Sequence, residues 1–343
     1  LDNARHGLVA RDEDTADGVR NPFVERVVAC ADGLPLYVHL LLEDLRNGRL
    51  SVHDEQRLPA GLMAYYDALM DRVGLSDLKR DLPLLVAVLA RAEEPLDRDA
   101  LAVLLADVPG DAPRYAERVQ SAERAGTALL RAAPTADGTE GLTLYHQSFR
   151  EYLVGRPASG DLPAVAPAPA LAGTVQDAGA KLCRLAQGWA ELPSGNLRNH
   201  LFRWGVRYAL RWQGEAGRAA ARRRLTDFVF LQAFTKEMPS IAIRGLVTDY
   251  ETVLNRLPDG PERNEFRLWE AFFREREYIL RRGDERWPAY KILLQLAVEH
   301  ADDSPVTRGA EEWLRQQRCE WVWLRRERRA AHVRTSACRA VLE

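Results

Sequence analysis

Apolar residues recur every three to four positions along most of the chain, a spacing that predicts helices. The clearest apolar face follows Pro59, at relative positions 0, 3, 4, 7, 8 and 11: Leu62, Tyr65, Tyr66, Leu69, Met70 and Val73. An earlier helix begins near Asn21, with an apolar stripe of Phe23, Val24, Val27 and Val28. Gly33 suits the end of that helix, and Pro35 suits the first turn of the next one. We therefore predict a small three-helix bundle over residues 21–75.

The pattern over residues 76–155 changes period partway along. It predicts a strongly apolar helix that ends around Pro95, a second helix capped by Asp97 with Ala100, Leu101, Leu104 and Leu105 buried, and a third from Pro113 to Arg124. Two short segments near residues 128–132 and 142–145 then flank Asp137-Gly138, a hairpin signal. A last helix falls in HQSFREYLVG, where Phe149 and Leu153 would be buried. Three helices followed by a two-stranded wing predict a winged-helix domain.

The rest of the chain divides at residues 156–173, where Pro and Ala alternate without an apolar face. We expect this stretch to be an extended linker that does not pack. Residues 174–343 return to helical spacing, with the last apolar stretch at Trp321, Val322 and Leu324 forming a half-buried helix. Thr226-Asp227 and Thr248-Asp249 indicate helix caps. Because no signature of a known repeat recurs, we predict an irregular helical arm.

The predicted fold class is therefore mainly α: a small helical bundle, a winged-helix domain with one β-hairpin, and an irregular all-helical array. The predicted domains are a linker (1–20), a helical lid domain (21–75), the winged-helix domain (76–155), a Pro/Ala linker (156–173) and the helical arm (174–343).

Composition limits the class of protein. The 48 basic and 50 acidic residues leave a formal net charge of −2, which argues against a dedicated nucleic-acid binder. No apolar run approaches the ~20 residues of a membrane-spanning helix, and the first residues are too charged for a signal peptide. The four cysteines are scattered, as in proteins of a reducing compartment. We expect a cytoplasmic protein, and the initial Leu1 indicates a fragment of a longer chain.

The sequence offers no catalytic motif. It contains no G-x-x-x-x-G-K-S/T phosphate loop, no G-x-S-x-G elbow and no H-E-x-x-H pair. The adjacent carboxylates Glu93-Glu94 and Glu311-Glu312 do not face a common point on a helix, so we interpret them as solvated. We therefore expect no enzyme activity, no metal and no cofactor in the isolated chain.

Two segments carry a family resemblance. CADGLPLYVHLLLEDL (residues 30–45) resembles the GLPL motif of the signal-transduction ATPases with numerous domains (STAND), the superfamily of the NACHT and apoptotic-ATPase proteins. LTLYHQSFREYLVG (residues 142–155) resembles the segment that closes the winged-helix domain in NACHT proteins. The spacing of about 110 residues matches the order of lid and winged helix in that family. More loosely, residues 197–254 resemble the helical stretch before a WD40 propeller in bacterial members. The closing residues RTSACRAVLE resemble the segment that leads into the first blade of that propeller.

The resemblance implies a role in a nucleotide switch. By position, Pro35 would pack against the adenine of ADP and His146 would bond its β-phosphate. The nucleotide, ATP or ADP with Mg²⁺, would be held by an N-terminal P-loop NTPase domain that these residues do not include. The chain would then be the regulatory and scaffolding portion of the parent ATPase, transmitting its state to a WD40 sensor and assembling with further copies on activation.

Other interpretations stay open. Pro35 could simply start a helix, and His146 could be a core histidine at the end of a strand. A winged helix could also bind DNA, but the candidate recognition helix places Glu117 and Glu123 among its arginines, which would repel phosphates. A helical scaffold that binds protein partners without a nucleotide role is the remaining alternative. The presence of a P-loop domain upstream in the parent gene would distinguish the nucleotide role from this scaffold role.

Overall fold

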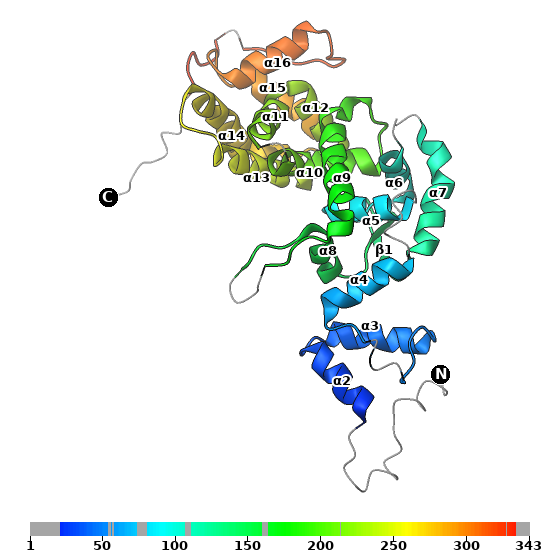
Figure 1. Ribbon diagram of the computed structural model, residues 1–343. Coiled ribbons are helices and arrows are strands. Elements are labelled where there is room, and N and C mark those ends of the chain that lie inside the picture. The colour runs from blue at the N-terminus through cyan, green and yellow to red at the C-terminus, as the bar shows by residue number, and fades with distance from the viewer. Residues whose placement is uncertain are drawn as a thin grey trace. The chain divides into compact units, whose positions relative to one another are not determined.

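The computed structural model describes residues 21–53, 56, 58–73, 81–106, 111–159, 164–212, 214–326 and 328–333. Within these ranges lie fifteen α-helices and one two-stranded antiparallel hairpin, so the protein is mainly α, as the sequence predicts (Figure 1). None of the described helices is both long and apolar enough to cross a bilayer. The predicted linker over residues 1–20 and the run-in RTSACRAVLE lie outside the described residues.

The chain divides into two compact units. Unit 1 comprises Leu1–Ala90, Ser121–Arg131 and Leu144–Val175, and unit 2 comprises Arg91–Gln120, Ala132–Thr143 and Gln176–Glu343. The elements predicted for the winged-helix domain occur in the predicted order: α5 (Asp81–Arg91), α6 (Arg98–Leu105), α7 (Ala112–Ala125), β1 (Leu130–Pro134), β2 (Glu140–Leu144) and α8 (Gln147–Val154). Because they are shared between the units, a single winged-helix domain stays a prediction.

The helices at the start of unit 1 begin and end where local signals place them. They are α2 (Pro22–Ala31), α3 (Pro35–Arg46) and α4 (Leu62–Val73). Asn21 caps α2 by accepting from the Phe23 amide at 2.9 Å. Asp32 and Gly33 then take φ values of 45° and 72°, left-handed conformations that end the helix. Pro35 occupies the first turn of α3, as predicted.

Aromatic rings from α4 and α8 pack together in the core of unit 1. The Tyr66 ring of α4 lies 5.0 Å from that of Phe149 and 5.4 Å from that of Tyr152, both on α8. Of the face predicted after Pro59, all side chains that the structure describes are buried. The predicted stripe on α2 is wrong, because Val24 and Val28 are 47% and 66% exposed. Only Phe23 of that stripe is buried, and the helix buries its end instead, through Cys30 and Ala31.

The Pro/Ala segment packs, contrary to prediction, over residues 164–171. Arg156 and Val165 form an antiparallel bridge, and the Ala168 amide donates to the Tyr152 carbonyl at 2.9 Å. Ala168 and Leu171 are buried, and a short 3₁₀ turn (η3, Pro169–Leu171) leads into α9 (Ala172–Gln187). Backbone pairing with its neighbours therefore replaces the apolar face that this segment lacks.

The hairpin of β1 and β2 starts and ends within two residues of its prediction. Gly138 takes a φ of 81° in the turn, a conformation that glycine adopts without strain. Within unit 2, Leu96 pairs with Leu142 on β2 through two backbone hydrogen bonds of 3.1 and 2.8 Å. Asp97, the N-cap of α6, directly follows Leu96 and thus lies beside the hairpin. Asp97 itself accepts from the Ala100 amide at 2.8 Å, as predicted.

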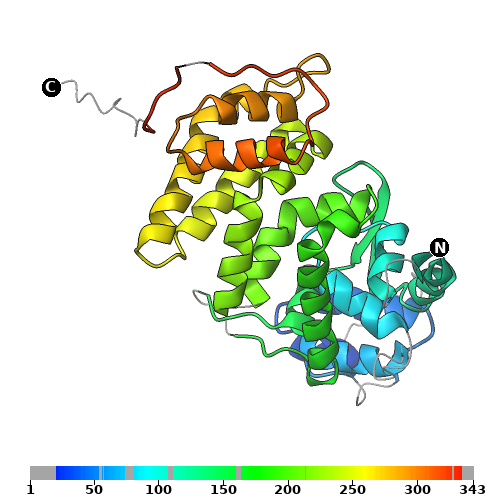
Figure 2. The same ribbon diagram turned by 90° about the horizontal axis from the view of Figure 1, so that it is seen from above.

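The arm of unit 2 is an array of helices joined by short turns. After η4 (Trp189–Glu191) its α-helices are α10 (Asn196–Trp212), α11 (Gly214–Thr226), α12 (Phe228–Glu237), α13 (Ile243–Leu254, preceded by η5, Ser240–Ala242), α14 (Pro261–Leu280), α15 (Ala289–Val298) and α16 (Pro305–Arg315). Neighbours in sequence pack together, as α10 with α11, α13 with α14 and α15 with α16 (Figure 2). Phe266, Trp269, Phe273 and Leu280 of α14 are all buried.

Two predictions for the arm are wrong. Asp227 caps α12, but Asp249 lies inside α13 and is 4% exposed, so it caps nothing. The predicted last helix is replaced by the C-terminal segment (residues 319–326 and 328–333), which has neither helix nor strand. Val322 and Leu324 there are 85% and 72% exposed.

The C-terminal segment runs beside α15 and α16 (Figure 2), and charged groups attach it to them and to the turn between them. Arg329 pairs with Asp302 at 2.5 Å and with Glu311 at 2.8 Å, and Arg326 pairs with Glu299 at 2.9 Å. The amides of Asp302 and Asp303 donate to main-chain carbonyls of the segment at 2.9 and 3.1 Å. The Trp321 ring adds contacts with Tyr290 of α15 at 5.2 Å and with Trp313 of α16 at 5.7 Å, so charged pairs and one aromatic side chain together hold this segment.

Candidate functional site

His146 stands at the junction of β2 and α8 in unit 1. Its backbone is extended (φ −142°, ψ 147°), so it is the N-cap residue of α8, and its Nδ1 accepts from the Ser148 amide at 3.1 Å. The side chain is exposed. The interpretation of His146 as a buried core histidine is therefore wrong.

The cap fixes the tautomer of the His146 ring. A backbone amide can only donate, so Nδ1 must carry a lone pair. In the neutral ring the proton then sits on Nε2, which makes no hydrogen bond within the described residues. His146 consequently presents an N–H donor to its surroundings.

A chain of hydroxyls continues from His146 into unit 1. The Ser148 hydroxyl lies 2.8 Å from His146 Nδ1 and 2.7 Å from the Tyr66 hydroxyl. Because Nδ1 accepts, the serine hydroxyl donates to it and accepts from Tyr66. Burial raises the pKa of Tyr66, while Ser148 lowers it less and Glu151 raises it further, so Tyr66 keeps the proton it donates. The buried tyrosine thus helps to orient the exposed histidine.

Pro35 lies on the surface at the start of α3. Its ring has no N–H and offers an apolar face. One helical turn later, His39 Nε2 lies 3.1 Å from the hydroxyl of Tyr145, the residue before His146. The start of α3 and the start of α8 are therefore linked within unit 1, although about 110 residues separate them in sequence.

The N-terminus of α8 suits an anion. Helix N-termini carry unpaired amides and a partial positive charge. The first turn of α8 contains no acidic residue. An anion near His146 would thus meet an N–H donor and the positive end of a helix.

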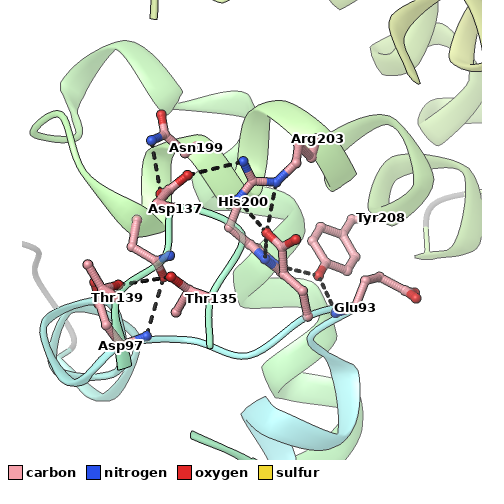
Figure 3. Close-up of polar contacts among 11 residues, drawn as sticks. Glu93, Asp97, Thr135, Asp137, Thr139, Asn199, His200, Arg203 and Tyr208 are labelled. Carbon is pink, nitrogen blue, oxygen red and sulfur yellow. Dashed lines mark hydrogen bonds and ion pairs between the residues drawn. The ribbon is translucent and has the colours of Figure 1, made fainter. Parts of the chain in front are cut away.

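Unit 2 contains a separate polar cluster that sequence reasoning missed (Figure 3). His200 of α10 is fully buried, with Nδ1 3.1 Å from Glu94 Oε1 and Nε2 2.6 Å from the Tyr208 hydroxyl. Arg203 donates to Glu94 at 2.9 and 2.6 Å and reaches Asp137 of the hairpin turn at 3.4 Å. These contacts join α10 to the hairpin turn and to the residues after α5.

The cluster contradicts the interpretation of Glu93-Glu94 as a solvated pair on a helix. Both residues follow the end of α5, and they point to different partners: Glu93 binds Arg211 at 2.6 Å. Burial alone would raise the pKa of Glu94, but hydrogen bonds from His200 and Arg203 outweigh it and lower the pKa to about 2. The other pair, on α16, is also engaged: Glu311 binds Arg329, and Glu312 binds Arg315.

The same burial decides the charge of His200. Desolvation lowers its pKa, although Glu94 pulls in the opposite direction. We therefore assign a neutral ring that donates from Nδ1 to Glu94 and accepts at Nε2 from Tyr208, with Arg203 as the counter-ion of Glu94. Glu94, His200 and Tyr208 are hydrogen-bonded in a row, as the groups of an acid–base relay would be. However, the side chains of His200 and Tyr208 are both 0% exposed to solvent. The cluster is a structural clasp, because no substrate can reach it.

No sequence motif signals this clasp, because Glu94 and the α10 residues His200 and Arg203 are more than 100 residues apart and meet only in the folded chain. Across the described ranges, no three His, Cys, Asp or Glu side chains gather as a metal site. Comparison with protein-family models, curated proteins and solved structures found no match for this chain.

Proposed function

We propose that unit 1 reads the bound nucleotide in a switched signalling ATPase of the STAND/NACHT class. His146 would donate from Nε2 to the β-phosphate of ADP, and Pro35 would lie against the adenine. The nucleotide itself would be held by a P-loop domain outside these residues. The observation that carries the proposal is the outward Nε2–H of His146, fixed by its own cap at the start of α8.

The geometry supports this role over a purely structural one. A histidine is an uncommon N-cap compared with Ser, Thr, Asp or Asn, each of which could accept from the Ser148 amide without a ring. What the ring adds is a donor on its far side. The link between His39 and Tyr145 supports a joint role for the two motif segments, since it places both helix starts on the same unit.

The proposal makes the phosphate contact a bias on a two-state equilibrium. A hydrogen bond to a charged group contributes about 1.5–3 kcal/mol. If the contact exists only in the closed, ADP-bound state, its loss multiplies the open population roughly 10- to 150-fold.

The test uses the full-length gene product with its P-loop domain. Release of a fluorescent ADP analogue and resting oligomerisation are compared for wild type, His146→Asn and His146→Ala. Asparagine is a strong N-cap but is too short to present the outward donor. We expect His146→Asn to keep the melting temperature and to release ADP roughly 10- to 150-fold faster. His146→Ala should show the same release and also lose about 1 kcal/mol of stability with the cap.

His53→Ala is the matched control, because His53 is an exposed histidine of the same unit. Its ADP release should equal that of wild type. Unchanged ADP release in His146→Asn, or a parent gene that encodes no P-loop domain, would refute the proposal and favour a helical scaffold without a nucleotide role.

A further inference from the structure

Unit 2 contains a cavity of about 460 Å³ between α9, α10 and α11. Five small residues line it: Ala186, Gly205, Ala209, Ala220 and Ala221. Because none of their side chains extends beyond Cβ, the three helices leave a space that larger residues would fill. Cavities of a few hundred Å³ are the size that small organic ligands occupy.

The wall of the cavity is apolar and its rim is polar. Cys183 and Ala221 are fully buried, and Trp189 is 8% exposed. Gln187, Arg223 and Asp227 are exposed at the rim, so a carboxylate of the protein also borders the opening. A ligand would therefore place an apolar body inside and a polar group near the opening.

Arg224 contributes a fixed cation to this wall. Its Nη1 donates to the Ala186 carbonyl and its Nη2 to the Leu201 carbonyl at 2.8 Å. Its Cζ lies 4.1 Å from the centre of the Phe230 ring. Two carbonyls and a ring hold the guanidinium in place, while its Nε–H is buried with no acceptor among the described residues.

The charge of Arg224 is incompletely balanced. In the part of the chain that the structure describes, no carboxylate oxygen forms an ion pair with it within 4.0 Å. Burial lowers the pKa of Arg224 to about 9, and the more distant Asp249 and Asp227 oppose that shift. The Asp227 carboxylate already accepts from the Val229 amide at 2.9 Å. Burial raises the pKa of Asp249 to about 7, so at neutral pH it is only partly charged, whereas Arg224 is a full cation.

Gly205 shows that α10 leaves room for this guanidinium. A Cβ at this position would lie 3.0 Å from Arg224 Cζ and 3.1 Å from its Nη2. Glycine is unfavourable inside a helix relative to alanine, and here it lies in the middle of α10. The close approach of the Arg224 side chain, together with the Ala186 Cβ that an added Cβ would also meet at 3.0 Å, accounts for it.

We propose that this cavity binds a small organic acid, with its apolar body against the alanine wall and its carboxylate at Arg224. A guanidinium is the cation best suited to a carboxylate, because its planar N–H groups match the two oxygens. The proposal is independent of the nucleotide contact, since every residue that carries it lies in unit 2.

The test compares acids with their amides, which have the same shape and no charge. 1-Naphthylacetate and octanoate, each beside its amide, are titrated into the whole chain by calorimetry. Alanine-methyl NMR locates the binding. We expect each acid to bind at least tenfold more tightly than its amide and to shift the methyls of Ala186, Ala209, Ala220 and Ala221.

Variants separate the charge from the space. Arg224→Met should abolish the preference for the acid, and Arg223→Met, the matched control at the rim, should keep it. Ala209→Leu fills the cavity and leaves Arg224 unchanged, so it should remove binding of both forms even if Arg224→Met fails to fold. Equal affinity of acid and amide, no binding of either acid, methyl shifts elsewhere, or full binding by Ala209→Leu would each overturn the proposal.

Discussion

Replacing Glu94 with glutamine removes the negative charge at the centre of the clasp while keeping its shape. In the wild type, Glu94 accepts from His200 and twice from Arg203, and its side chain is 13% exposed. Among the described residues, the variant leaves Arg203, itself 17% exposed, with only Asp137 at 3.4 Å as a counter-ion. We expect this loss of charge to destabilise unit 2.

The magnitude follows from the pKa of Glu94. It is lowered from 4.5 to about 2 by the bonds to His200 and Arg203, which outweigh burial. A difference of this size corresponds to roughly 3 kcal/mol of folding free energy at neutral pH. Because the folded pKa is depressed, this stability is complete above the unfolded pKa and is lost as the pH falls through about 2. By about pH 3 less than half of it is left.

Urea unfolding followed by tryptophan fluorescence measures this effect, because all eight tryptophans lie in residues 176–343 of unit 2. Glu94→Gln should cost roughly 2–3 kcal/mol from about pH 5 to pH 8, and less as the pH falls below that range. Glu93→Gln is the control on the same turn. Its partner Arg211 is 50% exposed, so its loss should cost at most about 1 kcal/mol.

Equal losses in the two variants would refute the reasoning, because they would mean that the buried bonds of Glu94 add nothing to a surface pair. A penalty for Glu94→Gln that stays constant down to pH 3 would contradict the assigned pKa and point to packing as its cause.

Three further predictions concern single residues. Burial raises the pKa of Asp249 from 3.8 to about 7, so its ionisation should remove stability as the pH rises between these values. In urea unfolding at pH 8, the free energy of unfolding of Asp249→Asn should exceed that of wild type by up to roughly 4 kcal/mol. A difference that does not depend on pH would contradict this assignment. Long-range ¹H–¹⁵N spectra should show the proton of His146 on Nε2, and an Nδ1–H signal would disprove the assigned cap. Gly205→Ala should displace Arg224 and lower the melting temperature despite the better helix propensity of alanine; a higher melting temperature would show that the guanidinium moves freely.

Local signals in the sequence are sufficient to locate several helix starts. Asn21, Pro35 and Asp97 act within two or three residues of themselves, so their positions alone determine where α2, α3 and α6 begin. Gly138 marks the hairpin turn for the same reason. Such contacts need no knowledge of the rest of the fold.

Errors arose where distant contacts decide the outcome. As cap signals, Thr226-Asp227 and Thr248-Asp249 are indistinguishable. Asp249 nevertheless lies within α13, because that helix buries residues both before and after it. Glu94 was interpreted as solvated because its partners His200 and Arg203 lie over 100 residues away. The candidate site divides in the same way. The motif positions single out Pro35 and His146, both of which are exposed, whereas the tautomer of His146 depends on its contact with Ser148, which no sequence pattern indicates.

The C-terminal segment responds to its surroundings differently from the helices beneath it. Its attachment includes arginine–carboxylate pairs, of which the exposed pair of Arg326 is the one that dissolved salt screens most, whereas the ring contacts of Trp321 with Tyr290 and Trp313 are not weakened in this way. Hydrogen exchange at the amides of Asp302 and Asp303, which donate to this segment, should therefore accelerate as sodium chloride is added while exchange inside α14 does not. The concentration of ions around the protein would therefore change how often the segment leaves the carboxylates of Glu299 and Asp302 uncovered.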